Sequence, residues 1–525
     1  MSGKKYFCTL ITVLLCGCSL VRFQTPSCPA DHWEAATSES VGLEPNALTD
    51  TLKIIRDNGW RVDSMQVVRH GKMVVDAYFY PYSSGHPHDL RSVTKSVTSS
   101  LLGLSIAQGK WSGVEMPVLS QFPDRTIEAV DDRKRAITLG NLVDMRSGLA
   151  WKEHPYDEES SINLMYKSKD WIGFALNQPM AAAPGSQFNY SGANMNLLAA
   201  MIGKTWNLPT REVARTRLFE PIGITHFYWN GVDPDGNTIG ESTLYLLPTD
   251  MARLGLLWLH DGVWQDRRIL PAGWTGKVLA TALPAEADGG FYKRGFWVNQ
   301  AKTRYAAIGR HDQTIVVDPA LDMVIVITGK SGDNEESHLF QVANMIRHGV
   351  SAAPNLPPDP AAEAVLEAMV RQVAQPPMKN LGMVGLGASQ YGKRWQLEKN
   401  RLGITSLYLS VDPGDAGAMF LELGTKSPKV ARYPCGLDGC FRFSPNEDAH
   451  NQLLALKGNW LSPTLLEMEF QYPDSGDSTY TIIRVEFKGE GLSINFADNQ
   501  YFSGTIHSLA NKDRSHPESA KVPES

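Results

Sequence analysis

The sequence predicts an α/β (α+β) domain followed by an all-β domain. Two apolar runs around a His-Gly-Lys turn at 65–80 are typical of a β-hairpin, and a second strand pair is expected at 305–318 and 323–328. Apolar helical stretches follow Ser92 and cover 194–203. In the C-terminal part of the chain, short alternating segments separated by Gly, Pro, Asp and Asn replace these patterns. Such a series of short strands is typical of a small barrel or sandwich.

Length and composition indicate two globular units. A chain of 525 residues is too long for one ordinary core. We place a linker at 351–380, where a Pro-rich start is followed by a short helical stretch, between domains at 45–350 and 381–507. The polar segment 508–525 is expected to be a disordered tail. The net charge is −6 and the body has no long basic run, so nucleic-acid binding has no electrostatic support.

Residues 1–18 have the pattern of an export signal. Two lysines precede an apolar run from Tyr6 to Leu15, which is too short to span a bilayer comfortably. Leu15 lies three residues before Cys18, with Gly17 directly before it, which resembles the bacterial lipoprotein signal. On this reading Cys18 is acylated and anchors an outer-membrane lipoprotein that faces the periplasm. The alternative is a plain secretory signal, which releases the protein.

The remaining cysteines suggest a disulfide rather than a metal site. Cys435 and Cys440 flank a Gly-Leu-Asp-Gly turn and are expected to close a hairpin disulfide in an oxidising compartment. Cys28 has no predicted role. The sequence has no C-x-x-C pair and no H-E-x-x-H motif, so we predict neither a metal nor a cofactor.

Ser92 and Lys95 form the most informative motif of the chain. Residues three apart lie on one face of a helix, one turn from each other, so Lys95 is expected to reach the Ser92 hydroxyl. A serine needs such a partner to attack a carbonyl group, and a lysine that is neutral part of the time can accept its proton. The alternative is that Lys95 is a helix residue paired with some carboxylate, because an isolated buried ammonium is costly.

Six blocks in order resemble the serine β-lactamase-like superfamily, whose nucleophile box is S-x-x-K. The local details are most similar to its 6-aminohexanoate-dimer hydrolase branch, beside the class C β-lactamases and related carboxylesterases. The resemblance implies a β-lactamase/transpeptidase-like fold, with an antiparallel sheet flanked by helices and a helical part across the active-site cleft. The blocks are DLRSVTKSVTSS at 89–100, ITLGNLVDMRSGLAW at 137–151, PGSQFNYSGANMNLL at 184–198, LFEPIGI at 218–224, PTDMARLG at 248–255 and GRHDQTIVVDP at 309–319.

The resemblance implies roles for three residues. Ser92 matches the nucleophile, Lys95 its activating partner and Tyr190 the second proton carrier. A tyrosine beside a lysine can pass a proton to the leaving group. Without the surrounding block, Tyr190 would be interpreted as an ordinary cleft or core aromatic.

The resemblance also implies an oxyanion hole of two backbone N–H groups. One is that of Ser92 at its helix N-terminus, and the other is expected near Asp312-Gln313. Asp312 stands where the family pattern has glycine, so its carboxylate must be turned away or paired, for which Arg310 is the nearest candidate. His311 is expected either to line the pocket or to face solvent from a strand.

Taken together, these features predict an exported serine hydrolase that acts through an acyl-enzyme on a small amide or ester. Trp151 is expected to line the pocket, as are the aromatic residues Tyr166 and Trp171, although packing roles are equally compatible with their positions. The sequence lacks the K-T-G and S-D-N motifs of penicillin recognition. The alternatives are a β-lactamase or D-Ala-D-Ala carboxypeptidase, and a non-catalytic binding protein on the same fold.

Overall fold

The computed structural model of the chain describes eleven segments. These are residues 28–29, 32–154, 158–285, 290–331, 338–377, 385–400, 403–425, 431–446, 452–471, 480–498 and 503–509. The predicted signal with Cys18, and the tail from residue 510 onward, lie outside them. In the part of the chain that is described, no helix is long and apolar enough to cross a membrane.

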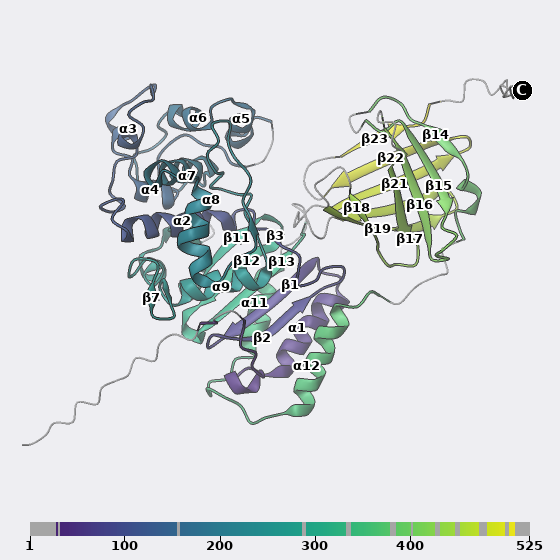
Figure 1. Cartoon of the computed structure of the whole chain (residues 1–525), viewed down its shortest axis with the longest axis horizontal. Coiled ribbons are helices and arrows are strands. Elements are labelled where there is room, and N and C mark those ends of the chain that lie inside the picture. The colour runs from purple at the N-terminus through teal and green to yellow at the C-terminus, as the bar shows by residue number, and fades with distance from the viewer. Residues whose placement is uncertain are drawn as a thin grey trace, which may run out of the picture.

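One antiparallel sheet of eight strands forms the centre of the first domain (Figure 1). The predicted hairpin at 65–80 is confirmed as β1 and β2, which turn at His70-Gly71. In spatial order the strands are β2 (Lys72–Tyr78), β1 (Val62–Arg69), β13 (Met323–Gly329), β12 (Gln313–Asp318), β11 (Tyr305–Gly309), β10 (Phe296–Val298), β9 (Phe291–Lys293) and β8 (Leu283–Pro284).

Helices cover both faces of this sheet. In β13, Val324 and Val326 pack into one core, whereas Met323, Ile325 and Ile327 pack into the other, as the period of two in a strand requires. The helices that complete the second core are α1 (Pro45–Asp57), α11 (Leu339–His348) and α12 (Pro360–Val373). Those that complete the first core at the sheet are α2 (Val93–Ala107), α9 (Pro248–Leu259) and α10 (Val278–Thr281).

A helical part lies beyond α2, on the side of the domain away from α1 and α12 (Figure 1). It consists of α3 (Asp132–Arg135), α4 (Leu139–Val143), α5 (Ser161–Lys167), α6 (Trp171–Asn177), α7 (Gly192–Trp206) and α8 (Thr210–Ala214). The short strands of this domain are β3 (His88–Asp89), β4 (Phe227–Tyr228), β5 (Tyr245–Leu246), β6 (Val263–Trp264) and β7 (Arg267–Arg268). The predicted β-lactamase/transpeptidase-like fold is therefore confirmed.

The predicted linker differs from the structure. Its helical stretch is α12, which belongs to the first domain because Leu366 and Val373 are buried in the core with α1, β1 and β2. These two residues are seven apart and therefore lie on one face of the helix. Residues 351 and 356 also donate backbone hydrogen bonds to Gly42 and Glu39. The connection between the domains is thus shorter than predicted.

The second domain is a curled, mostly antiparallel sheet, here called the barrel, where the alternating segments predicted a small barrel or a sandwich. Its edges meet where Leu397 and Ser508 form a bridge, and Leu509 donates to the carbonyl of Gln396. The strands are β14 (Arg394–Gln396), β15 (Ser406–Val411), β16 (Ala418–Gly424), β17 (Ala431–Gly436), β18 (Arg442–Asn446), β19 (Gln452–Ser462), β20 (Leu465–Gln471), β21 (Tyr480–Lys488), β22 (Gly491–Asp498) and β23 (Ser503–His507).

The predicted Cys435–Cys440 disulfide is not formed. The two side chains have different surroundings. Cys435 is packed in the barrel core, where burial raises the pKa of its thiol. The Cys440 thiol donates to the carbonyl of Pro377, at a distance of 3.5 Å.

Candidate active site

Strained backbone places Ser92 at the start of α2. Leu90 donates to the carbonyl of Leu244, which fixes the incoming chain beside β5. Arg91 then has φ 48°, a left-handed conformation that costs a non-glycine residue about 1–2 kcal/mol. Asp89 stabilises it twice, because Oδ1 accepts from the Arg91 backbone N–H at 3.0 Å and Oδ2 pairs with Nε at 3.0 Å. Ser92 follows as the N-cap residue; it is partly exposed, and its hydroxyl oxygen accepts no capping hydrogen bond.

Lys95 reaches Ser92 as the spacing predicted. Its Nζ lies 2.8 Å from Ser92 Oγ, within hydrogen-bonding distance. The side chain is 1% exposed, and its ammonium also donates to the carbonyl oxygen of Glu241 at 3.0 Å. Glu241 Oε2 lies 3.4 Å from the same nitrogen. Lys95 therefore contacts both Ser92 and a carboxylate, so the two predicted interpretations of Lys95 hold together.

Tyr190 completes the group from the segment that leads into α7. The Lys95 ammonium lies 5.0 Å from the centroid of its ring. The ring stacks on Trp297 at a centroid distance of 5.7 Å and meets Tyr292 edge-on at 6.3 Å. Burial raises the pKa of the Tyr190 phenol, while the Lys95 charge and a hydrogen bond with Ser92 partly oppose this. Tyr190 therefore keeps its proton at neutral pH and is suited to donate it.

Two buried glutamates at the site were not predicted. Glu153 accepts hydrogen bonds from Trp151 Nε1 at 2.5 Å and from the Gly192 N–H at 3.0 Å. Burial raises the pKa of Glu153, the Lys95 charge lowers it, and the nearby Glu241 raises it further. The only signal in the sequence was the cost of burying a lysine, which predicted a carboxylate partner without identifying it. Glu153 and Glu241 lie in loops and belong to no motif.

The predicted aromatic residues support this arrangement. Trp151 is buried and meets Phe174 edge-on at 6.3 Å, so it positions Glu153 in addition to packing. The hydroxyl of Tyr166 donates to Glu241 Oε1 at 2.5 Å, and its ring lies 4.8 Å from that of Trp171. Because the Tyr166 side chain is well exposed, it is the one of the three that presents a surface to solvent.

The predicted strand at 305–318 is in fact two strands, β11 and β12, joined by a tight turn. The turn arises because His311 and Asp312 have φ of 63° and 67°, which no strand accommodates. At the end of β11, Gly309 lies against the start of α2. A Cβ on Gly309 would lie 2.3 Å from the carbonyl oxygen of Leu90 and 3.1 Å from the Ser92 nitrogen. Only glycine permits this approach.

The turn is held from within. His311 is buried, so its solvent-facing alternative is wrong, and its Nδ1 lies 2.6 Å from the carbonyl oxygen of Ser331. The Gln313 amide donates to the carbonyl oxygens of His311 at 3.0 Å and Gly329 at 2.7 Å. The Gln313 side chain thus stabilises the turn. The second oxyanion donor, a backbone N–H near Asp312-Gln313, stays a prediction, as does the pairing of Asp312 with Arg310.

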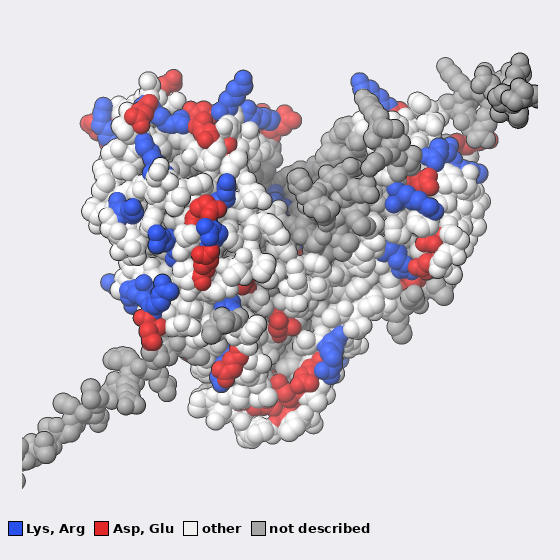
Figure 2. All heavy atoms as spheres, viewed as in Figure 1, with Lys and Arg blue, Asp and Glu red and all other residues white. Residues whose placement is uncertain are grey.

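Charges of both signs are interspersed on the face shown in Figure 2. Among the residues in the described segments, no group of three or more His, Cys, Asp and Glu side chains is arranged to hold a metal ion.

Comparison with known proteins gives one family match and several relatives. A family model described as Beta-lactamase matches residues 54–346, more than half of the chain. A 6-aminohexanoate-dimer hydrolase of Paenarthrobacter ureafaciens is 24% identical over 311 residues, which cover 55% of this chain and 78% of that protein. A beta-lactamase of Escherichia coli (strain K12) is 30% identical over 146 residues, which cover 28% of this chain and 35% of that protein.

Solved structures also resemble the chain. EstCE1, a hydrolase with promiscuous acyltransferase activity, has a TM-score of 0.49 and 17% identity, and the match covers 58% of this chain and 99% of that one. An octameric penicillin-binding protein homologue from Pyrococcus abyssi has a TM-score of 0.44 and 14% identity, with 88% of this chain and 99% of that one covered.

Proposed function

The chain belongs to the Beta-lactamase family of hydrolases, and on that premise we propose that it is a serine hydrolase that acts through an acyl-enzyme. The observation that carries this proposal is the 2.8 Å separation between Ser92 Oγ and Lys95 Nζ, with the Tyr190 ring beside them. A nucleophile, a base within hydrogen-bonding reach and a second proton carrier are the parts that acyl transfer needs.

Acylation begins when the Lys95 amine, in its neutral form, takes the proton of Ser92. Oγ then forms a bond to the substrate carbonyl carbon, and the carbonyl oxygen becomes an oxyanion. We assign the stabilisation of that charge to the Ser92 backbone N–H at the N-terminus of α2, because the helix dipole favours anions there. Tyr190 gives its proton to the leaving nitrogen or oxygen as the bond to the carbonyl carbon breaks, and it regains a proton from Lys95.

Deacylation reverses these roles. A water molecule loses a proton to the same lysine and tyrosine pair and attacks the ester carbon of the acyl-enzyme. The bond to Ser92 Oγ then breaks, the proton returns to Oγ, and a carboxylic acid leaves. The carbonyl oxygen and the carboxylate of Glu241 keep the lysine head in place during both steps.

For the substrate we propose a small amide or ester. The name of the Paenarthrobacter ureafaciens relative, a 6-aminohexanoate-dimer hydrolase, favours a short linear amide. The segment GRHDQ at 309–313 stands in place of K-T-G, and Gly192 follows Tyr190-Ser191, so the usual contacts to a penicillin carboxylate and side-chain amide are not provided. We therefore expect weak turnover of penicillins and cephalosporins relative to simple esters.

We also propose that the enzyme works outside the cytoplasm, attached to a membrane by lipid on Cys18. The motif at 15–18 supports this, and its small-molecule substrate is then met in the periplasm.

One experiment tests the assignment of the nucleophile and the substrate class together. The intact protein is incubated separately with a fluorophosphonate, a penicillin and a short p-nitrophenyl ester, and its mass is measured. We expect a stable fluorophosphonate adduct on Ser92, absent in Ser92→Ala and retained in Ser84→Ala, an exposed serine nearby. Efficient nitrocefin hydrolysis would favour the β-lactamase alternative, and no adduct with any probe would favour a binding protein.

A further inference from the structure

Two residues of β20, Glu469 and Gln471, contact the first domain. Being two apart, they lie on one face of the strand, while Leu466, Met468 and Phe470 face the barrel core. Glu469 Oε1 lies 3.4 Å from Arg61 Nη1. Gln471 Oε1 accepts a hydrogen bond from the Tyr82 hydroxyl at 3.1 Å. The Gln471 amide also donates to Glu469, so the two contacts are joined.

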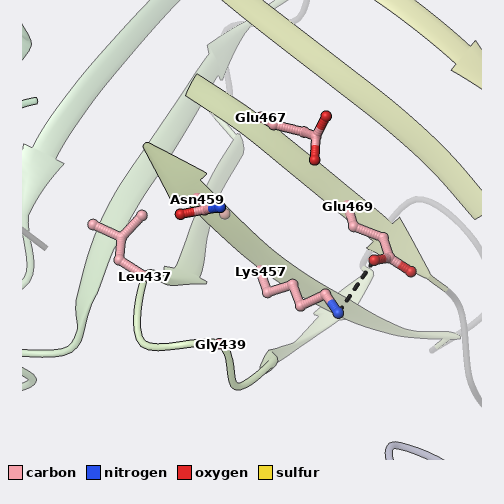
Figure 3. A pocket seen from close by; sticks show the side chains of 7 residues that line it. Leu437, Gly439, Lys457, Asn459, Glu467 and Glu469 are labelled. Carbon is pink, nitrogen blue, oxygen red and sulfur yellow. Dashed lines mark ion pairs between the residues drawn. The ribbon is translucent and has the colours of Figure 1, made fainter. Parts of the chain in front are cut away.

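Two further residues of the barrel, Tyr480 and Lys457, hold Arg61 and Glu469 in place. The Arg61 guanidinium lies 3.8 Å from the centroid of the Tyr480 ring. Burial works to raise the pKa of Glu469, but the charges of Lys457 and Arg61 lower it below the usual range, so the carboxylate stays ionised. Figure 3 shows the Lys457 ammonium directed at Glu469, in a pocket of about 330 Å³ on the outer face of the barrel.

In the first domain, Arg61 and Tyr82 both contact Lys330, the residue after β13. The carbonyl oxygen of Arg61 accepts from the Lys330 N–H at 2.8 Å, and the Lys330 ammonium lies 4.5 Å from the centroid of the Tyr82 ring. Lys330 is 2% exposed. The five residues form a closed ring of contacts, which we call the β20 clamp: Arg61, Tyr82, Lys330, Glu469 and Gln471.

The neighbours of Lys330 in turn hold the β11–β12 turn. The carbonyl oxygen of Gly329 accepts from the Gln313 amide, and that of Ser331 lies 2.6 Å from His311 Nδ1. Two consecutive left-handed residues, His311 and Asp312, persist only where surrounding contacts hold them. The position of the turn at Ser92 therefore depends on the segment 329–331 that the clamp fixes.

From this chain of contacts we infer that the barrel positions the oxyanion side of the active site. Arg61, Tyr82, Glu469 and Gln471 are positioning residues, which act through Lys330 and the turn rather than by touching the substrate. The inference rests on the proposed function, and it gives the second domain a part in the chemistry. Breaking the clamp should lower kcat more than it changes KM, because the oxyanion forms only on the way to the acyl-enzyme.

Tyr82→Phe and Glu469→Gln test the inference in the full-length chain. Each removes one contact of the clamp, and Tyr82→Phe removes only a hydroxyl group and should leave the fold intact. Removal of an oxyanion donor costs about 10²- to 10³-fold in kcat, so partial displacement should cost about tenfold, with KM within about twofold. The double variant should lose less than the product of the two single losses, since both act on one ring.

The matched control is Arg484→Gln, which removes an ion pair of 2.7 Å with Glu467 on the outside of the same barrel. Its kcat should equal that of the wild type, and Glu469→Asp should regain part of the loss because it keeps the charge. The inference is overturned if folded Tyr82→Phe and Glu469→Gln keep the wild-type kcat, or if Arg484→Gln loses as much kcat as they do.

Fluorophosphonate labelling separates this inference from the proposed function. If Ser92 of the wild type is not labelled, the proposed function fails. If both clamp variants are labelled at the wild-type rate, only the positioning role is refuted.

Discussion

Glu241 holds Lys95 from two directions, since its carbonyl oxygen lies 3.0 Å and its Oε2 3.4 Å from the lysine Nζ. The carboxylate is itself fixed, because Tyr166 and Ser242 both donate to Oε1. A long side chain that would otherwise sample many rotamers is thereby directed at Ser92 Oγ. The site thus gains its geometry from a residue that lies 146 positions away in the chain.

Removal of either member of the serine–lysine pair should abolish hydrolysis. For Ser92→Ala and Lys95→Ala we expect the rate on a short-chain p-nitrophenyl ester to fall about 10³-fold or more, because groups that act as a unit lose most of their effect together. The measurement is kcat/KM, and circular dichroism checks that each variant is folded. Ser84→Ala is the control. An unchanged rate in Ser92→Ala would refute the assignment of the nucleophile.

Loss of the Tyr190 hydroxyl should slow proton transfer without unfolding the protein. In Tyr190→Phe the stacking on Trp297 is retained, so thermal stability should stay near that of the wild type. We expect kcat to fall about 10²- to 10³-fold, within the usual contribution of a general acid. Since burial raises the pKa of Tyr190 above 10, wild-type activity should show no alkaline limb from this group below about pH 10.

The control for this prediction is Tyr228→Phe, which removes a hydroxyl from a well-exposed tyrosine. A pH–rate profile with an alkaline limb near neutrality that disappears in Tyr190→Phe would show that the phenol titrates lower than the structure indicates.

Local sequence patterns predicted those parts of the site that lie close together in the chain. The i, i+3 spacing of Ser92 and Lys95 was sufficient to place their side chains within reach, because a helix fixes that geometry. Runs of apolar residues likewise predicted β1, β2 and β13 of the first domain and an all-β second domain. Tyr190, almost a hundred residues away, was found only through a family resemblance, since its own surroundings read as packing.

Local sequence patterns could not predict contacts between distant segments of the chain. Glu153 and Glu241 lie in loops without periodicity, and only the cost of a buried lysine indicated that a carboxylate was needed. Strand-forming residues flank 309–313 on both sides within the 305–318 segment, and they conceal the two left-handed residues at 311–312. The Cys435–Cys440 spacing fits a hairpin, yet the Cys435 thiol packs in the barrel core and the Cys440 thiol donates to the carbonyl of Pro377.

Glu153→Gln should stabilise the protein in a pH-dependent manner. Burial, partly opposed by Lys95, raises the pKa of Glu153 above the usual 4.5, so the folded state binds this proton more tightly than the unfolded state. The resulting stability is fully present below about pH 4.5 and is lost as the pH rises through the folded-state pKa. Glutamine can accept the same hydrogen bonds without a charge.

The melting temperatures of Glu153→Gln and the wild type should therefore agree at acidic pH and separate as the pH rises, with the variant higher. Thermal melts followed by calorimetry across this range measure the difference. Glu115→Gln, at an exposed position, is the matched control and should show no such trend. A gap that widens towards acidic pH would contradict the raised pKa.

Lipid attachment at Cys18 is tested by its removal. The lysines, the short apolar run and the Leu-x-Gly-Cys ending predict a diacylated Cys18, so wild-type protein should partition with membranes and its N-terminal peptide should carry the added lipid mass. Cys18→Ser should yield a soluble or unprocessed form. Cys28→Ser is the control and should partition as the wild type does. A mature N-terminus elsewhere without lipid would indicate a simple secreted protein.

Asp312 offers the sharpest test of the oxyanion side. The residue has φ 67°, in a place where the family pattern has glycine, so Asp312→Gly relieves backbone strain and removes a carboxylate near the developing charge. We expect that carboxylate to be held away from the oxyanion by a cation, with Arg310 the nearest candidate in sequence. In that case Asp312→Gly changes kcat by less than about twofold, and Arg310→Ala lowers kcat or stability by releasing the carboxylate. Steady-state kinetics on the p-nitrophenyl ester, with melts of both variants, decide the matter. A several-fold rise of kcat in Asp312→Gly means that the carboxylate opposes the reaction, and an Arg310→Ala variant with wild-type rate and stability excludes the pairing.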